Sequence, residues 1–201
     1  MKHESKVAGN AARLWSLVSK AAALVAVAAL GVLGSMSTAM AATHTEHLVY
    51  TTMHSVGFDA SVAAAHGYEI RTTSDGKQYS VPRGAPAAVA PHNVVSGDCG
   101  RSWVWEDGIG NAAVSLDTGF NVYTATVGRQ WNVILDDNGG TSTQGFSGGP
   151  TGAYWDSSRT VGGLTRGPGY AHINSNGSNF AILIDGNVCY SGGPSDSTTI
   201  Y

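Results

Sequence analysis

From His92 onward the chain consists of short β-forming runs separated by glycine-rich turns, about every ten residues. Residues 180–184 (FAILI) are continuously apolar, which is typical of a central strand covered on both faces. Asp185-Gly186 then predicts a turn into a run at 187–190. Further runs lie at 102–106, 113–116, 122–127 and 130–135. The pattern predicts a mainly β fold over residues 92–201, an antiparallel β-sandwich or a small barrel.

A short helix and a β-hairpin are expected before this domain. Asp59 or Ser61 can cap a helix over residues 58–66, and Gly67 can end it. Runs at 68–73 and 77–81 flank Asp75-Gly76, a strong hairpin signal. Residues 42–56 have no sustained hydrophobic periodicity and are interpreted as a loose arm. Together with the helix and the hairpin, this arm makes up residues 42–81. Residues 82–91 (PRGAPAAVAP) are interpreted as a Pro/Ala linker.

The N-terminal segment has the features of an export signal. Lys2, Lys6, Arg13 and Lys20 precede an apolar run at 21–32, which is shorter than the roughly 20 residues that a bilayer span needs. Ala39-Met40-Ala41 matches the small-x-small cleavage pattern, so residues 1–41 are predicted to be a signal peptide. A retained N-terminal anchor is the alternative. The absence of an Arg-Arg pair favours the general secretory route, and we expect a secreted protein without a membrane span after cleavage.

Both cysteines, Cys99 and Cys189, lie in the part expected to be exported. In an oxidising compartment they should form one disulfide, and two buried thiols are the alternative. The bridge would close a loop of 90 residues. In the chain-entropy model the bridge lowers the conformational entropy of the unfolded chain, which stabilises the folded protein by roughly 4 to 5 kcal/mol.

Composition excludes two classes of protein. The chain is 42% hydrophobic and 12% charged, which is unlike a disordered polyelectrolyte. Its formal net charge is −3, and removal of residues 1–41, which carry +3, leaves −6. The few remaining basic residues are scattered, so nucleic acid is not expected as a partner.

One segment resembles the nucleophile region of trypsin-like serine proteases. Residues 145–150 (GFSGGP) contain Ser147, and His66 and Asp98 precede it in the order that the family uses. Phe146 stands where the family has Asp, and SGGP recurs at 191–194, which favours a turn. A small serine-type extracellular hydrolase is kept as an alternative function.

Metal ligands are present without a recognisable site pattern. His44, His47 and His54 lie in the arm, which has no helical periodicity and no Cys or third ligand at a recognisable distance. Residues 136–140 (DDNGG) offer oxygen ligands but lack the alternation and closing Glu of a calcium loop, so they predict a hairpin turn. We therefore expect no metal, no cofactor and no catalytic residue.

Tryptophan is abundant in the β domain. Trp103 and Trp105 alternate onto one face of their strand, and Trp155 follows later. An exposed row of such rings would stack on sugar rings, whereas buried rings would form the core. Trp103, Trp105 and Trp155 are the candidate ligand-binding residues, and Trp131 is favoured as a core residue.

Four segments together resemble a group of small secreted two-cysteine proteins of high-GC Gram-positive bacteria. They are residues 65–72 (AHGYEIRT), 75–81 with Asp75-Gly76 and Tyr79-Ser80-Val81, 97–100 (GDCG) and 188–192 (VCYSG). The resemblance implies export and the two-cysteine layout. It implies no activity, because the group has no established one.

The sequence thus favours a secreted, non-catalytic β domain with a binding or structural role outside the cell. A glycan or cell-wall polymer is the expected ligand. A protein-interaction module that self-associates through its arm and hairpin is a further alternative, and the oligomeric state is left open.

Overall fold

The computed structural model describes residues 49–87 and 98–201, which belong to one compact unit. The predicted signal peptide at 1–41 and residues 88–91 of the predicted linker lie outside this part. One helix is described, α1 (Ala60–Ala65). The strands are β1 (Val49–Phe58), β2 (Tyr68–Thr72), β3 (Gln78–Pro82), β4 (Asp98–Gly110), β5 (Ala113–Val122), β6 (Thr126–Gln130), β7 (Asn132–Asp137), β8 (Gly140–Gly145), β9 (Tyr154–Gly162), β10 (Gly167–His172), β11 (Phe180–Leu183), β12 (Asn187–Tyr190) and β13 (Ser195–Ile200).

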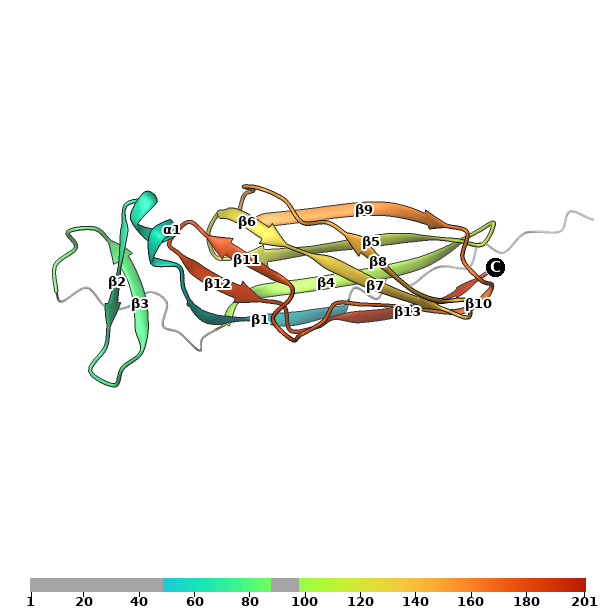
Figure 1. Ribbon diagram of the computed structural model, residues 1–201, viewed down its shortest axis with the longest axis horizontal. Coiled ribbons are helices and arrows are strands. Elements are labelled where there is room, and N and C mark those ends of the chain that lie inside the picture. The colour runs from blue at the N-terminus through green and yellow to red at the C-terminus, as the bar shows by residue number, and fades with distance from the viewer. Residues whose placement is uncertain (1–48, 88–97) are drawn as a thin grey trace, which may run out of the picture. The chain divides into compact units, whose positions relative to one another are not determined.

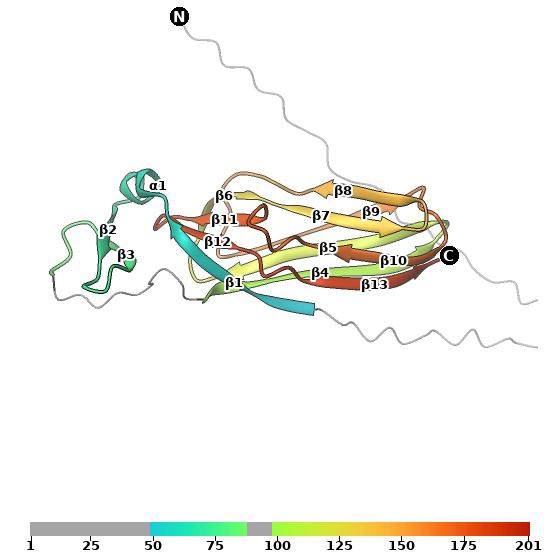
Figure 2. The same ribbon diagram turned by 60° about the horizontal axis from the view of Figure 1, so that its bottom comes forward.

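Two antiparallel sheets form the β domain (Figures 1 and 2). The larger has seven strands in the order β6-β11-β12-β1-β4-β5-β9, and the smaller has four in the order β13-β10-β7-β8. Their facing sides supply one hydrophobic core, so the predicted mainly β, antiparallel architecture is confirmed. As expected for the FAILI segment, β11 is a central strand, between β6 and β12.

Strand β1 corrects the prediction of a loose arm for residues 49–56, whereas residues 42–48 of that arm lie outside the described part. It lies in the middle of the large sheet between β12 and β4, with Met53 and Ser55 buried. Its inward positions carry few apolar residues, so the segment has little hydrophobic periodicity and its sequence does not predict a strand. The helix and hairpin therefore come between two strands of the sheet, β1 and β4, instead of before the whole β domain.

The helix and hairpin form where the sequence predicts them. The Asp59 carboxylate caps α1 by accepting hydrogen bonds from the amides of Ser61 and Val62. The Asp59 amide donates to the carbonyl of Gly186, at 2.7 Å, in the turn between β11 and β12. Gly186 has a φ of +86°, and a side chain there would meet Ala63 of the helix. The start of α1 is thus anchored directly on the large sheet.

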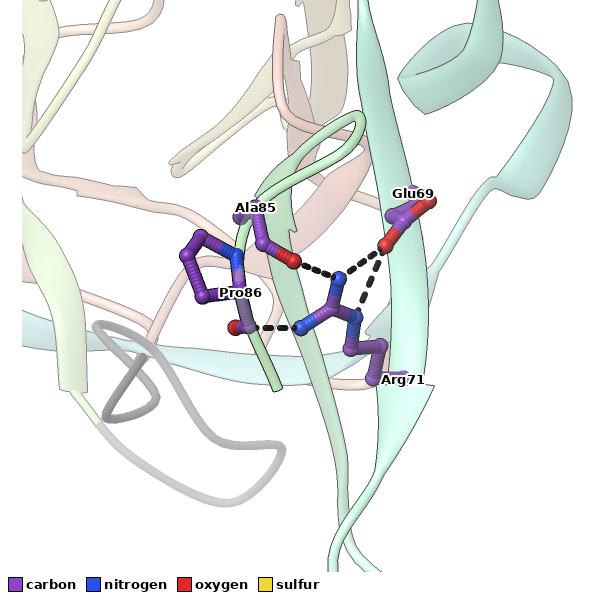
Figure 3. A network of polar contacts seen from close by, with 4 residues as sticks. All are labelled: Glu69, Arg71, Ala85 and Pro86. Atoms are coloured by element: carbon purple, nitrogen blue, oxygen red, sulfur yellow. Dashed lines mark hydrogen bonds and ion pairs between the residues drawn. The ribbon is translucent and has the colours of Figure 1, made fainter. Parts of the chain in front are cut away.

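The β2–β3 hairpin holds the chain that follows it (Figure 3). The Arg71 guanidinium pairs with the Glu69 carboxylate on the same strand. It also donates to the carbonyls of Ala85 and Pro86, so the first residues after β3 lie against β2. Part of the predicted Pro/Ala linker is therefore bound to the hairpin.

Three aromatic rings fill the centre of the core. Trp131 lies where the chain leaves β6 for β7 and so passes from the large sheet to the small one, and it is fully buried. Its ring packs against Phe120, at 5.3 Å between centroids, and against Trp155, at 5.9 Å. The Trp131 indole N–H donates to the Thr118 hydroxyl at 2.9 Å, which satisfies the polar atom of this buried ring.

The predicted disulfide joins Cys99 of β4 to Cys189 of β12, with 6.1 Å between their Cα atoms. Both residues belong to the core. Strand β1 lies between β4 and β12 in the sheet, and its register shifts against both strands near the bridge. One further strand, β13, follows β12 along the chain and belongs to the small sheet.

We expect the double substitution Cys99→Ala/Cys189→Ala to lower the free energy of unfolding by about 4 kcal/mol, because the unfolded chain regains the freedom of the 90-residue loop. Urea unfolding of the parent and the variant measures this difference. A loss below about 1 kcal/mol would show that the bridge contributes little to stability.

Strand β13 packs over the second half of β4, where the pairing with β1 has ended. The Asp196 carboxylate accepts a hydrogen bond from the Glu106 amide at 2.8 Å, and the Thr198 hydroxyl accepts one from the Gly108 amide at 3.1 Å. Gly108 permits this approach, because a Cβ there would lie 2.2 Å from the carbonyl oxygen of Thr199. Side chains of β13 thus satisfy backbone groups of β4 that have no strand partner on that side.

The Glu106 side chain is enclosed between the two sheets. It is 3% exposed, and among the described residues neither carboxylate oxygen has a hydrogen-bond partner. Burial, and secondly the charge of Asp196, raise the pKa of Glu106 from 4.5 to about 7. The folded protein therefore holds this proton to a higher pH than the unfolded chain does.

This raised pKa predicts a pH-dependent loss of stability. The contribution of Glu106 is fully present below pH 4.5 and is lost as the pH rises towards about 7. We expect Glu106→Gln to be more stable than the parent at pH 8, by about 2 kcal/mol, and nearly equal to it at pH 4. Urea unfolding of both proteins at the two pH values tests this, and an equal difference at both would contradict it.

Candidate ligand-binding face

The outward side of the large sheet carries a cluster of aromatic and acidic side chains. Its central row runs across four strands through Tyr50, Trp103, Gly119 and Asp156, which stand opposite one another in register. The adjacent row places Trp105 opposite Asp117. The predicted placement of Trp103 and Trp105 on one face of their strand agrees with this register.

Trp103 forms the floor of this cluster and is only 4% exposed. Its indole lies over Gly119, where a Cβ would come within 2.3 Å of the ring. Tyr154 stacks on it at 5.5 Å between centroids, and Tyr50 packs edge-on at 5.8 Å. The ring can lie flat on the sheet because the strand beside it has no side chain at this position.

Tyr50 and Tyr154 are the solvent-accessible rings of this cluster. They are 44% and 56% exposed, so much of each ring is in contact with solvent although both are anchored on Trp103. The Arg101 guanidinium lies 4.7 Å from the centre of the Tyr50 ring, a cation–π contact. We define Tyr50, Trp103, Trp105, Asp117, Tyr154 and Asp156 as the aromatic face.

Two carboxylates complete the aromatic face. Asp117 accepts a hydrogen bond from the Trp103 indole N–H at 3.1 Å, which fixes the orientation of the ring. Partial burial raises the pKa of Asp117, and the nearby charge of Asp156 adds to this effect. Limited desolvation, and then the charges of Asp156 and Asp117, also raise the pKa of Tyr154. The two carboxylates and the tyrosine therefore lie close enough for the charge of one to affect the ionisation of the others.

The candidate tryptophans are not equivalent. Trp105 is partly exposed on the outward face, and Trp103 is beneath the tyrosines. Trp155 faces inward, packs 5.2 Å from Phe120 and is 9% exposed, so its expected place on a ligand surface is wrong. It is a core residue because the register of β9 turns Tyr154 outward instead.

Sequence reasoning missed Tyr50, Gly119 and Asp156. Tyr50 lies in the segment that the sequence predicts to be a loose arm, and the role of Gly119 depends on a cross-strand partner that the sequence does not specify. Tyr154 had a recognisable signal, because it alternates with Trp155 and one of the two must face outward.

The residues of the serine-protease resemblance are not assembled. The Asp98 carboxylate contacts His54 at 3.3 Å, whereas His66 caps the end of α1. The Ser147 hydroxyl accepts a hydrogen bond from the Trp131 amide at 2.8 Å, which is a structural role at the corner between the sheets.

The expected turn at 136–140 is present between β7 and β8. The Asp137 carboxylate accepts hydrogen bonds from the amides of Gly139 and Thr165, and these bonds lower its pKa. Its oxygens therefore stabilise the turn. Within the described part of the chain, no three His, Cys, Asp or Glu residues are grouped so that they could hold a metal ion. His44 and His47 lie outside that part.

Fold and site together define a disulfide-bonded antiparallel β-sandwich with an aromatic face on its larger sheet. Comparison with protein-family models, with curated proteins and with solved structures finds no match for this chain. In residues 49–87 and 98–201 no helix has the length and apolar character needed to cross a bilayer.

The aromatic face should depend on Gly119. We expect Gly119→Ala to lower the free energy of unfolding by about 2 kcal/mol, because the new methyl group would collide with Trp103 and with the Trp155 carbonyl. Gly162→Ala on β9 is the matched control, since its nearest neighbour would be 3.9 Å away. Urea unfolding compares the variants, and equal stabilities would show that Trp103 does not need the space above Gly119.

Proposed function

We propose that this protein is a secreted, non-catalytic β-sandwich that binds a glycan through the aromatic face. The observation that carries the proposal is the pair of solvent-exposed rings, Tyr50 and Tyr154, held on either side of a buried Trp103. Tyrosine presents an apolar ring face and a polar hydroxyl, which suits the mixed apolar and hydroxyl surface of a sugar. Exposed aromatic groups on an otherwise polar surface are typical of binding sites.

The arrangement favours an extended ligand. The aromatic face lies across neighbouring strands of the large sheet, and the strands that carry its exposed rings, β1 and β9, are separated by β4 and β5. A polysaccharide can place successive sugars on separate rings, and the carboxylates of Asp117 and Asp156 can accept hydrogen bonds from its hydroxyl groups. Since Trp103 fixes both rings, little side-chain freedom is lost on binding.

Export is the second part of the proposal. The basic residues, the apolar run at 21–32 and the Ala39-Met40-Ala41 pattern support a signal peptide and secretion by the general route. A disulfide is compatible with an oxidising compartment outside the cytosol. A cell-wall or environmental polymer would then be available as the ligand.

Binding to insoluble polysaccharides, measured as depletion of the protein from solution, tests the glycan proposal. We expect Tyr50→Ala and Tyr154→Ala each to weaken binding about tenfold, because each removes an exposed stacking ring. Tyr170→Ala is the matched control, since Tyr170 is 45% exposed on the smaller sheet. Thermal unfolding of every variant verifies that the fold is retained.

Two results would contradict the proposal. Parent protein that binds none of a panel of cell-wall and plant polysaccharides has no glycan function of this kind. Binding that is weakened as much by Tyr170→Ala as by Tyr50→Ala and Tyr154→Ala does not take place at the aromatic face.

A further inference from the structure

We propose that the preferred ligand of the aromatic face is a polysaccharide with free amino groups, such as a de-N-acetylated amino-sugar polymer. The inference rests on the proposed glycan function and specifies its ligand by charge. Its basis is the position of two uncompensated carboxylates, Asp117 and Asp156, beside the exposed rings.

The charge balance of the aromatic face is negative. Among the described residues, neither Asp117 nor Asp156 forms a salt bridge. Arg101 is the nearby cation on this side of the sheet, and its guanidinium lies over the Tyr50 ring. A cationic group that reached the two carboxylates would therefore displace no ion pair among the described residues, although one Asp117 oxygen already accepts the Trp103 indole N–H.

The register places the carboxylates beside the rings, Asp156 two residues from Tyr154 on β9 and Asp117 in the next row on β5. Asp156 stands opposite Gly119 in the row that contains Tyr50 and Trp103, and Asp117 bonds to the Trp103 indole. A sugar that stacks on Tyr154 would lie next to Asp156, the neighbouring outward residue of β9, and could extend from there towards Asp117. An ammonium group offers three N–H donors and a positive charge, both of which a pair of carboxylates accepts.

Aromatic rings add to this preference. The negative faces of Tyr50 and Tyr154 attract cations, as Arg101 over Tyr50 already shows within the protein itself. A neutral N-acetylated sugar would gain the stacking but not the charge interaction. Stacking and electrostatic attraction thus favour the same class of ligand.

The test compares a soluble β-1,4-linked glucosamine oligosaccharide with its fully N-acetylated counterpart, by calorimetry at low ionic strength and a pH at which the amine is protonated. We expect the parent to bind the free-amine form about tenfold more tightly, and Asp117→Asn/Asp156→Asn to abolish the difference. Asp136→Asn is the matched control, because Asp136 lies beside Tyr170 on the smaller sheet. Tyr50→Ala and Tyr154→Ala should weaken binding of both oligosaccharides.

The outcomes separate this inference from the proposed function. Equal binding of the two oligosaccharides, unchanged in Asp117→Asn/Asp156→Asn, would overturn the charge preference while leaving the glycan function in place. Binding of an oligolysine peptide as tightly as the free-amine sugar, unaffected by the tyrosine substitutions, would show attraction without sugar recognition and also overturn it. Absence of binding to both oligosaccharides, together with failure on the polysaccharide panel, would remove both proposals.

Discussion

Three consecutive residues at the centre of β5 organise both sides of the large sheet. Thr118 and Phe120 point into the core, where the Thr118 hydroxyl accepts the Trp131 indole N–H and Phe120 packs between Trp131 and Trp155. Gly119, between them, faces outward and lies beneath Trp103. Because side chains alternate across a strand, the packing of the core sets the position of the space that the outer indole occupies. The aromatic face is therefore coupled to the core through a single strand.

The polar groups in and around the core differ in how completely their hydrogen-bonding capacity is used. At one end of the large sheet, Ser55 donates to the Asn187 side chain at 2.6 Å, Asn187 donates to the Tyr123 hydroxyl at 3.0 Å, and Tyr123 donates to Asp185 at 2.5 Å. Burial, and then the hydrogen bond to Asp185, raise the pKa of Tyr123, so this hydroxyl remains a donor. The network joins β1 to the turn that anchors α1. Glu106, in contrast, has unpaired carboxylate oxygens and responds to pH.

The elements that could be predicted from the sequence are those specified by local patterns. Asp59 beside the helix, Asp75-Gly76 in the hairpin and the alternation of Trp103 with Trp105 each act within a few residues. The pairing of Cys99 with Cys189 could also be predicted, because the sequence contains only two cysteines. Strand β1 could not be recognised, since its inward positions are largely polar and it is stabilised by neighbours distant in the sequence. The outward direction of Tyr154 instead of Trp155 likewise depends on the register with β5.

The same non-local constraints decide which tryptophans can take part in binding. A strand pattern rich in tryptophan is consistent both with a core and with a ligand-binding surface. In this protein Trp103, Trp131 and Trp155 are buried and position other side chains. Trp131 and Trp155 fill the interior, while Trp103 lies flat above Gly119 and fixes two tyrosines that remain accessible. Since a buried indole loses its freedom on folding, the rings above it are already oriented before any ligand arrives. Recognition by the tyrosines and carboxylates then depends on a rigid foundation built from the larger aromatic residues.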